Sequence, residues 1–243
     1  MKFVIIYLLL SQLIFGQNFG QNKVQYDTFD WEYIVSPNFN VYYYGDNHDL
    51  AIFTSKVAEE SLDQIGKHLR WRSSKPVKII VYTSHNDFQQ TNIVNPYMPE
   101  GVGGVTELYK NRIVIPFEGS YTQFKHVIHH ELVHAFINDS VYGGSLKNMV
   151  ANSIKVQIPM WMNEGLAEYL SSGWDTNSEM WIRDLAINGG EFPQIHQLTG
   201  YMAYRGGQSV WNFITEKWGE ESIAEIFYQL KKMQYFHIVK RVA

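Results

Sequence analysis

Residues 123–138, QFKHVIHHELVHAFIN, place several ionisable side chains inside what otherwise reads as a buried helix. The apolar residues of this stretch recur at helical spacing: Phe124, Ile128, Leu132, Ala135 and Phe136. His130 and His134 are four residues apart, so on a helix they point the same way and could bind one metal ion together. Glu131 lies roughly 100° around the helix from His130, within reach of a water molecule on such an ion. The alternative is a helix that matches the pattern by chance, and a third ligand would separate the two interpretations.

Residues 159–169, PMWMNEGLAEY, supply a candidate third ligand. Glu164 and Glu168 share one helical face, and the opposite face is apolar. The alternative is a solvated acidic face with lysine or arginine partners. No basic residue occurs between Lys155 and Arg183, so we expect the two carboxylates to need another counter-charge. A zinc ion with two histidine ligands would supply it.

The two motifs, HELVH and W-x-N-E-G-x-A-E-Y, resemble those of the gluzincin metallopeptidases, the thermolysin-like and aminopeptidase-N-like peptidases of the peptidase MA clan. The resemblance implies that His130, His134 and Glu164 bind one zinc ion. It also implies that Glu131 is the general base and that Glu168 orients a ligand histidine. The two motifs are further apart than in thermolysin, so residues 139–159 are expected to form an insertion.

A closer resemblance is to exported bacterial TolB-like proteins, in which a gluzincin domain precedes a β-propeller. The stretches HNDFQQTN, GGVTELYKNRIVIPF, GWDT and AYRGGQS carry it. This sequence stops after KKMQYFHIVKRVA, and we favour truncation before a propeller over a true single-domain protein. We expect a peptidase domain at residues 24–232 and a C-terminal tail at residues 233–243.

The resemblance suggests further candidates for the site. Gluzincins commonly use a tyrosine or histidine after the third ligand to stabilise the oxyanion, and Tyr204 is our first candidate, ahead of Tyr201 and His196. A packing role for Tyr204 remains open. Gly103 and Gly104, in a strand expected to border the cleft, would let a substrate backbone approach.

Three more polar residues near these motifs have weaker claims. Glu107 loosely parallels a glutamate that binds the substrate N-terminus in aminopeptidases of the clan, but a surface strand carboxylate is the favoured interpretation. His126, four residues before His130, could line the cleft or bind a second metal, although a hydrogen-bonded histidine is more common. His129 is expected to be structural.

The remaining pattern predicts an α+β, zincin-like fold, with an N-terminal mixed β-sheet, a mostly helical C-terminal half and the active-site cleft between them. Strands are expected in residues 31–44 (two, broken at Ser36-Pro37-Asn38), in 77–83, and as a pair in 101–117. Helices are expected at residues 50–69, 121–138, 145–155, 160–171, 178–188, 203–218 and 220–232.

The N-terminus and the composition indicate where the protein works. Met1-Lys2 precedes a short apolar run that ends near Gly16, the pattern of a secretory signal peptide at residues 1–16. The run is shorter than the roughly 20 residues that a membrane anchor needs. The chain has no cysteine, which excludes thiolate ligands, disulfides and a lipid-modified cysteine. A net charge of −4 without a basic run gives no sign of nucleic acid or an anionic membrane surface as a partner.

Together these features predict an exported periplasmic or extracellular zinc peptidase that cleaves peptide or protein substrates and holds one Zn²⁺ per chain. Two other classes stay open. One is a non-catalytic module of the cell envelope that retains the zinc site as scaffold, against which the intact Glu131 argues. The other is a zinc hydrolase that acts on a different amide or an ester.

Overall fold

The computed structural model describes residues 23–70, 72, 75–94, 98–108, 110, 112–142, 157–189 and 191–242. The expected signal peptide at residues 1–16 and the expected helix at residues 145–155 lie outside these ranges. Among the described residues, no helix has the combination of length and apolar character needed to cross a bilayer.

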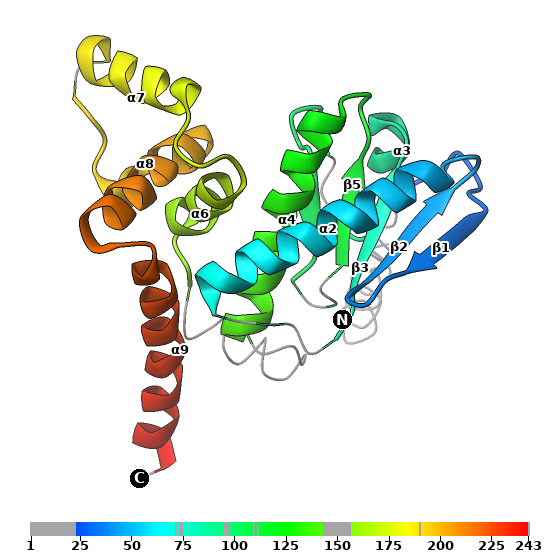
Figure 1. The fold of residues 1–243 in the computed structure, drawn as a ribbon. Coiled ribbons are helices and arrows are strands. Elements are labelled where there is room, and N and C mark those ends of the chain that lie inside the picture. Colours follow the sequence, from blue (N-terminus) through cyan, green and yellow to red (C-terminus); the bar gives the residue numbers. More distant parts are fainter. Residues whose placement is uncertain are drawn as a thin grey trace, which may run out of the picture.

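In the first part of the chain, the described residues form a five-stranded mixed sheet in the order β1-β2-β3-β5-β4 (Figure 1). Its strands are β1 (Trp31–Val35), β2 (Phe39–Tyr44), β3 (Val77–Tyr82), β4 (Val105–Thr106) and β5 (Arg112–Pro116). The three central strands run parallel, whereas β1 and β4 pair antiparallel at the two edges. The short strand β4 therefore borders the sheet, and it also contacts helix α4 (Tyr121–Tyr142).

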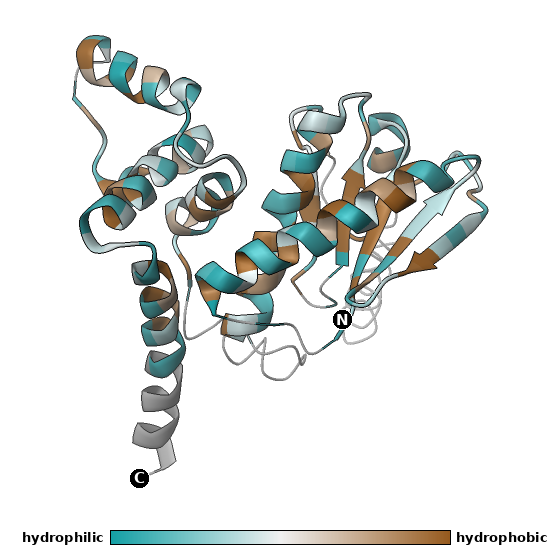
Figure 2. Cartoon of the chain, in the orientation of Figure 1, coloured by the Kyte–Doolittle hydropathy of each residue, from teal (hydrophilic) through white to brown (hydrophobic). Residues whose placement is uncertain are grey.

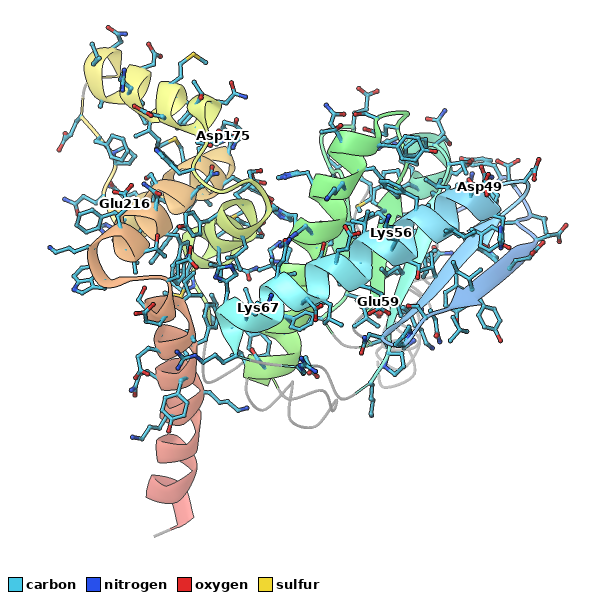
Figure 3. All side chains as sticks on the ribbon, viewed as in Figure 1. Asp49, Lys56, Glu59, Lys67, Asp175 and Glu216 are labelled. Carbon is cyan, nitrogen blue, oxygen red and sulfur yellow. The ribbon has the colours of Figure 1, made fainter. Side chains whose placement is uncertain are left out.

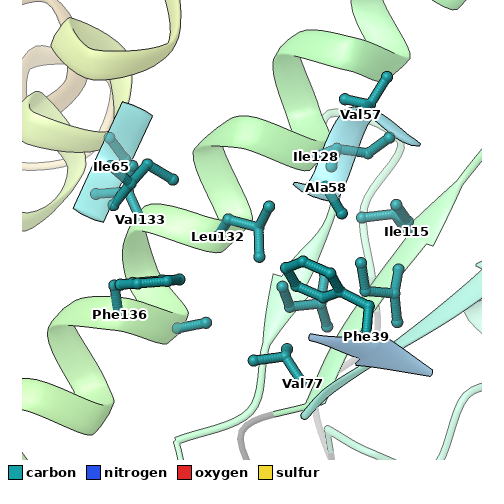
Figure 4. Close-up of a cluster of buried hydrophobic side chains, with 14 of the residues drawn as sticks. Phe39, Val57, Ala58, Ile65, Val77, Ile115, Ile128, Leu132, Val133 and Phe136 are labelled. Carbon is teal, nitrogen blue, oxygen red and sulfur yellow. The ribbon is translucent and has the colours of Figure 1, made fainter. Parts of the chain in front are cut away.

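The two faces of the sheet are covered by different helices because successive strand residues point to opposite sides. On β3 and β5, Ile79 and Ile115 belong to the main core, and Val114 belongs to a smaller cluster with Phe88 of α3 (His85–Gln89). Figure 4 shows the main core, where side chains of α2 (His48–Leu69) and α4 meet the strands. Figure 2 shows that apolar residues gather where these helices face the strands. Charged residues of α2, such as Lys56, point to solvent (Figure 3).

Helix α4 is buried on all sides in its middle. Every residue from Ile128 to Ile137 is buried, because the helix lies between the sheet and α2 on one side and α6 (Met160–Ser172) on the other (Figure 1). A helix in this position would ordinarily be apolar all round. The polar residues of its buried segment therefore have to be explained by their partners.

The second part of the chain is helical and consists of α6, α7 (Thr176–Asn188), a 3₁₀ turn (Ile195–Gln197), α8 (Tyr201–Trp218) and α9 (Glu221–Val242). Helices α6 and α8 touch backbone to backbone. A Cβ atom on Gly165 of α6 would overlap the backbone of Gly207 on α8, and a Cβ atom on Gly207 would overlap the carbonyl oxygen of Trp161. The indole of the fully buried Trp211 donates a hydrogen bond of 3.0 Å to the Met162 carbonyl and fixes the same contact.

The mixed α+β architecture and its order of elements match the prediction from sequence. The helix α3 was not predicted, because five residues give no measurable periodicity; Ser84 caps it by accepting a hydrogen bond from the Asp87 amide. Helix α7 begins at Thr176, two residues before the predicted start, because Asp175 caps it. Helix α9 continues through the expected tail to Val242. Helix α4, expected in the helical half, instead packs into the core of the sheet.

Candidate active site

The buried middle of α4 contains four ionisable side chains, His129, His130, Glu131 and His134, and each of these residues is less than 10% exposed. Burying a charged or hydrogen-bonding group without a partner costs several kcal/mol. Three of the four, His130, Glu131 and His134, lie against polar groups that other elements contribute. The sequence therefore places a cluster of polar groups inside the core, where apolar residues would pack more easily.

Three potential metal ligands converge between α4 and α6. His134 Nε2 lies 3.1 Å from His130 Nε2 and 3.2 Å from Glu164 Oε2, and His130 Nε2 lies 3.4 Å from the same carboxylate oxygen. These three residues form a group whose ligand atoms could hold one metal ion. The structure thus places Glu164, the predicted third ligand, beside both histidines.

The triangle fits a zinc ion in both size and donor type. With Zn–N and Zn–O bonds of about 2.0–2.2 Å, the ligand atoms of a tetrahedral site are separated by roughly 3.3–3.6 Å. Of the observed separations, 3.4 Å falls within that range, and 3.1 and 3.2 Å lie just below it. Two imidazole nitrogens and a carboxylate oxygen are also a donor set that zinc accepts, with a fourth position left for water or substrate.

The electrostatics of the cluster favour positive charge on the His130 ring. Burial alone would lower the pKa of His130, but the carboxylates of Glu164 and Glu168 raise it to about 10. Burial would conversely raise the pKa of both glutamates, but the adjacent histidines hold it well below its usual range. Either a proton on His130 or a divalent cation can balance the negative charge of these carboxylates.

Glu168 lies behind His130 and contacts several basic side chains. Its Oε1 is 3.1 Å from His130 Nδ1, although the ring N–H is not aligned for a hydrogen bond, and 3.4 Å from His126 Nε2. Its Oε2 accepts a hydrogen bond of 3.3 Å from Arg205 Nη1. The expectation that both glutamates lack a basic partner was therefore wrong for Glu168, because α8 brings Arg205 to it from 37 residues away.

Glu131 faces the edge strand of the sheet. Its Oε2 accepts a hydrogen bond of 2.6 Å from Thr106 Oγ1 on β4. Gly104 lies beside the same side chain, so that a Cβ atom there would come within 2.9 Å of Glu131 Cγ. The predicted substrate-binding residue Gly104 thus also makes room for the predicted base.

Tyr204 of α8 stacks on a predicted ligand. Its ring is nearly parallel to that of His130, at an interplanar angle of 11° and a centroid separation of 6.0 Å. Burial, followed by the negative charge of Glu164, raises the pKa of the Tyr204 hydroxyl, which therefore stays protonated and able to donate. The competing residues lie elsewhere: Tyr201 is 60% exposed and its hydroxyl accepts from Arg205, and His196 is exposed in the 3₁₀ turn.

A cavity of about 270 Å³ adjoins the cluster between the sheet side and α4. It is lined by Gly103, Pro116, Glu118, Ser120, Gln123, Phe124, His126 and Val127. Gly103 thus lines this cavity, and its neighbour Gly104 is the residue that contacts Glu131. Glu107, in contrast, is held by Arg112 through two hydrogen bonds of 2.6 and 3.0 Å.

His126 and His129 have different environments. His126 Nδ1 lies 2.9 Å from Ser172 Oγ, and the residue forms a second possible metal group with His130 and Glu168. His129 is buried, and burial together with the charges of His126 and His68 lowers its pKa to about 4, so its ring is neutral.

Histidines and a carboxylate that converge from two helices, beside a further buried glutamate in a mixed α+β fold, define a metallopeptidase-like domain. Over residues 57–237 the sequence matches the family model described as Peptidase MA superfamily. The chain therefore belongs to the Peptidase MA superfamily. Among curated proteins, none matches the chain. The superfamily contains non-catalytic members as well as peptidases.

Two residues of the cluster were missed from sequence. Arg205 stands in the AYRGGQS stretch beside Tyr204, and the cation next to that candidate was the available signal. Thr106 stands in GVGGVTEL, and its place in a strand expected to border the cleft was the only indication. Neither spacing nor periodicity relates Arg205 to Glu168 of α6 or Thr106 to Glu131 of α4, because each contact joins two different elements.

Proposed function

We propose that the protein is a zinc-dependent peptidase of the gluzincin type that hydrolyses peptide bonds. The observation that carries the proposal is the compact triangle of His130, His134 and Glu164, with a buried Glu131 one residue after the first ligand. A scaffold site would need the three ligands but would have no use for a further buried acid beside them.

Each residue has a defined part in the proposed reaction. Zinc held by His130, His134 and Glu164 would polarise the substrate carbonyl and make a water molecule more acidic. Glu131 accepts the proton of the attacking water and delivers it to the leaving amine. The Tyr204 hydroxyl donates a hydrogen bond to the developing oxyanion. Glu168, held by Arg205, orients His130 through its Nδ1 side.

The substrate is proposed to lie along β4. An edge strand can pair with an extended peptide, and Gly103 and Gly104 allow a close backbone approach there. The cavity beside Gly103 and Val127 offers space for a substrate side chain. We also propose that the protein is exported after cleavage near Gly16, which sequencing the N-terminus of the mature protein would test.

The substitution Glu131→Gln tests the proposal because it removes the base and keeps the shape of the side chain. We expect hydrolysis of a peptide library to fall by roughly 10²–10⁴-fold while zinc content stays unchanged. Glu216→Gln, on the exposed side of α8 (Figure 3), is the matched control and should leave turnover intact. Half-normal activity in Glu131→Gln, or a zinc-loaded wild type that cleaves no library peptide, would contradict the proposal.

A further inference from the structure

We propose that Thr106 is a positioning residue that holds Glu131 in its catalytic orientation. The inference rests on the proposed peptidase function, in which Glu131 is the base. It assigns to the edge strand β4 a second task, in addition to the proposed binding of substrate.

The contact between Thr106 and Glu131 is short and joins two different elements. Thr106 Oγ1 lies 2.6 Å from Glu131 Oε2 and 2.9 Å from the Glu131 main-chain oxygen, across 25 residues of sequence. A hydroxyl has one proton to donate. The shorter distance indicates that this proton goes to the carboxylate oxygen rather than to the main-chain oxygen.

Gly104 restricts the same carboxylate from a second side. A Cβ atom at this position would come within 2.9 Å of Glu131 Cγ and 3.0 Å of Glu131 Oε1. The Glu131 side chain therefore occupies the space that the missing side chain leaves. One oxygen, Oε2, is held by Thr106, and we assign the proton transfer to the other, Oε1, which lies over Gly104.

This arrangement links the proposed base, Glu131, to β4, the strand along which the substrate is proposed to lie. Thr106 pairs with Ile113 across the β4–β5 ladder, so its backbone position is fixed by the sheet. Among the described residues, β4 pairs with β5 alone, and a peptide that adds to its other side would be aligned by the strand whose side chain positions Glu131. The geometry thus sets the base and the scissile bond from one element, and a misplacement of about 1 Å can cost two orders of magnitude in rate.

The experiment compares Thr106→Val, which keeps the shape and removes the donor, with Thr106→Ser, which restores it. In crystal structures of the zinc-loaded protein, we expect Glu131 to occupy one position in the wild type and in Thr106→Ser. We expect it to be displaced or split over several positions in Thr106→Val. In parallel, kcat should fall roughly 10- to 100-fold in Thr106→Val, with KM and zinc content unchanged, and recover in Thr106→Ser.

Thr54→Val is the matched control, because Thr54 is a fully buried threonine of α2 whose hydroxyl donates to the Leu50 carbonyl. It should lower the unfolding midpoint without changing kcat. A Glu131 that keeps its position in Thr106→Val would overturn the inference, as would a normal kcat despite a displaced carboxylate. If the wild type proves inactive on peptides, the proposed function fails, and the crystal structures still decide whether Thr106 holds Glu131.

Discussion

The environment of the Tyr204 hydroxyl bears directly on whether this group acts in catalysis. The ring stacks on His130 and the hydroxyl stays protonated beside Glu164. The Tyr204 ring packs against His130 whether or not the hydroxyl takes part in catalysis. Only the donor distinguishes a catalytic role from a packing role.

Tyr204→Phe removes that donor and keeps the ring. We expect kcat to fall by up to roughly 10²–10³-fold, the cost of losing one oxyanion donor, with little change in the unfolding midpoint. Tyr201→Phe is the control, because the Tyr201 hydroxyl is bonded to Arg205 on an exposed part of α8. Wild-type kcat in Tyr204→Phe, at confirmed zinc content, would remove Tyr204 from the mechanism.

The protonation of His130 predicts a pH dependence of metal binding. In the metal-free protein the pKa of His130 is raised to about 10, so the ring carries a proton at pH 7. Zinc binds only the neutral imidazole, whereas Glu164, with its lowered pKa, is already ionised. Zinc binding at pH 7 should therefore release about one proton from His130, and this release should disappear as the pH rises through about 10.

Calorimetric titration with zinc, repeated in buffers of different ionisation enthalpy, measures this release directly. The observed heat should vary with the buffer at pH 7 in proportion to the protons released. Identical heats in all buffers at pH 7 would show that His130 is neutral before the metal binds.

Among the elements, the α6–α8 pair determines whether the cluster is assembled. Gly165 follows Glu164 directly and Gly207 follows Tyr204 and Arg205 closely, so the contact between the two glycines brings the three polar residues together. The absent side chains allow this approach, since either Cβ atom would overlap the opposite backbone.

Gly207→Ala should consequently disturb both stability and the site. We expect the free energy of unfolding to fall by at least about 1–3 kcal/mol, the usual cost of overpacking, because the clash is with backbone. Zinc affinity should weaken at the same time, as α6 carries Glu164. Gly101→Ala, where an added Cβ atom meets nothing within 4 Å, is the control for urea unfolding and zinc titration. Unchanged stability and affinity in Gly207→Ala would show that the helices can separate without consequence.

The elements also show how far the sequence could be interpreted. Residues four apart on one helix share a face, so His130 with His134 and Glu164 with Glu168 followed from local spacing alone. The contacts of Arg205 with Glu168 and of Thr106 with Glu131 depend on how α8 and β4 pack against other helices. No local pattern encodes such packing, and for the same reason the counter-charge of Glu168 was assigned wrongly.

In the whole molecule, the core and the candidate site both extend across the boundary between the part built on the sheet and the helical part. One continuous apolar core includes Phe39 of the sheet, Leu132 of α4, Leu166 of α6 and Trp211 of α8. The proposed ligands follow this arrangement, with two on α4 and one on α6. A bound zinc ion would therefore join the part built on the sheet to the helical part, and metal binding would add to the stability of the native state.

The zinc content of the purified protein, compared with that of Glu164→Ala, tests the central claim most directly. Elemental analysis should find about one zinc ion per chain in the wild type, held by three protein ligands. Glu164→Ala should lose most of it, because two imidazoles alone bind zinc far more weakly, and the control Glu216→Ala should retain it. Full zinc occupancy in Glu164→Ala would contradict the account, because it would show that the metal is held without the carboxylate that joins α6 to α4.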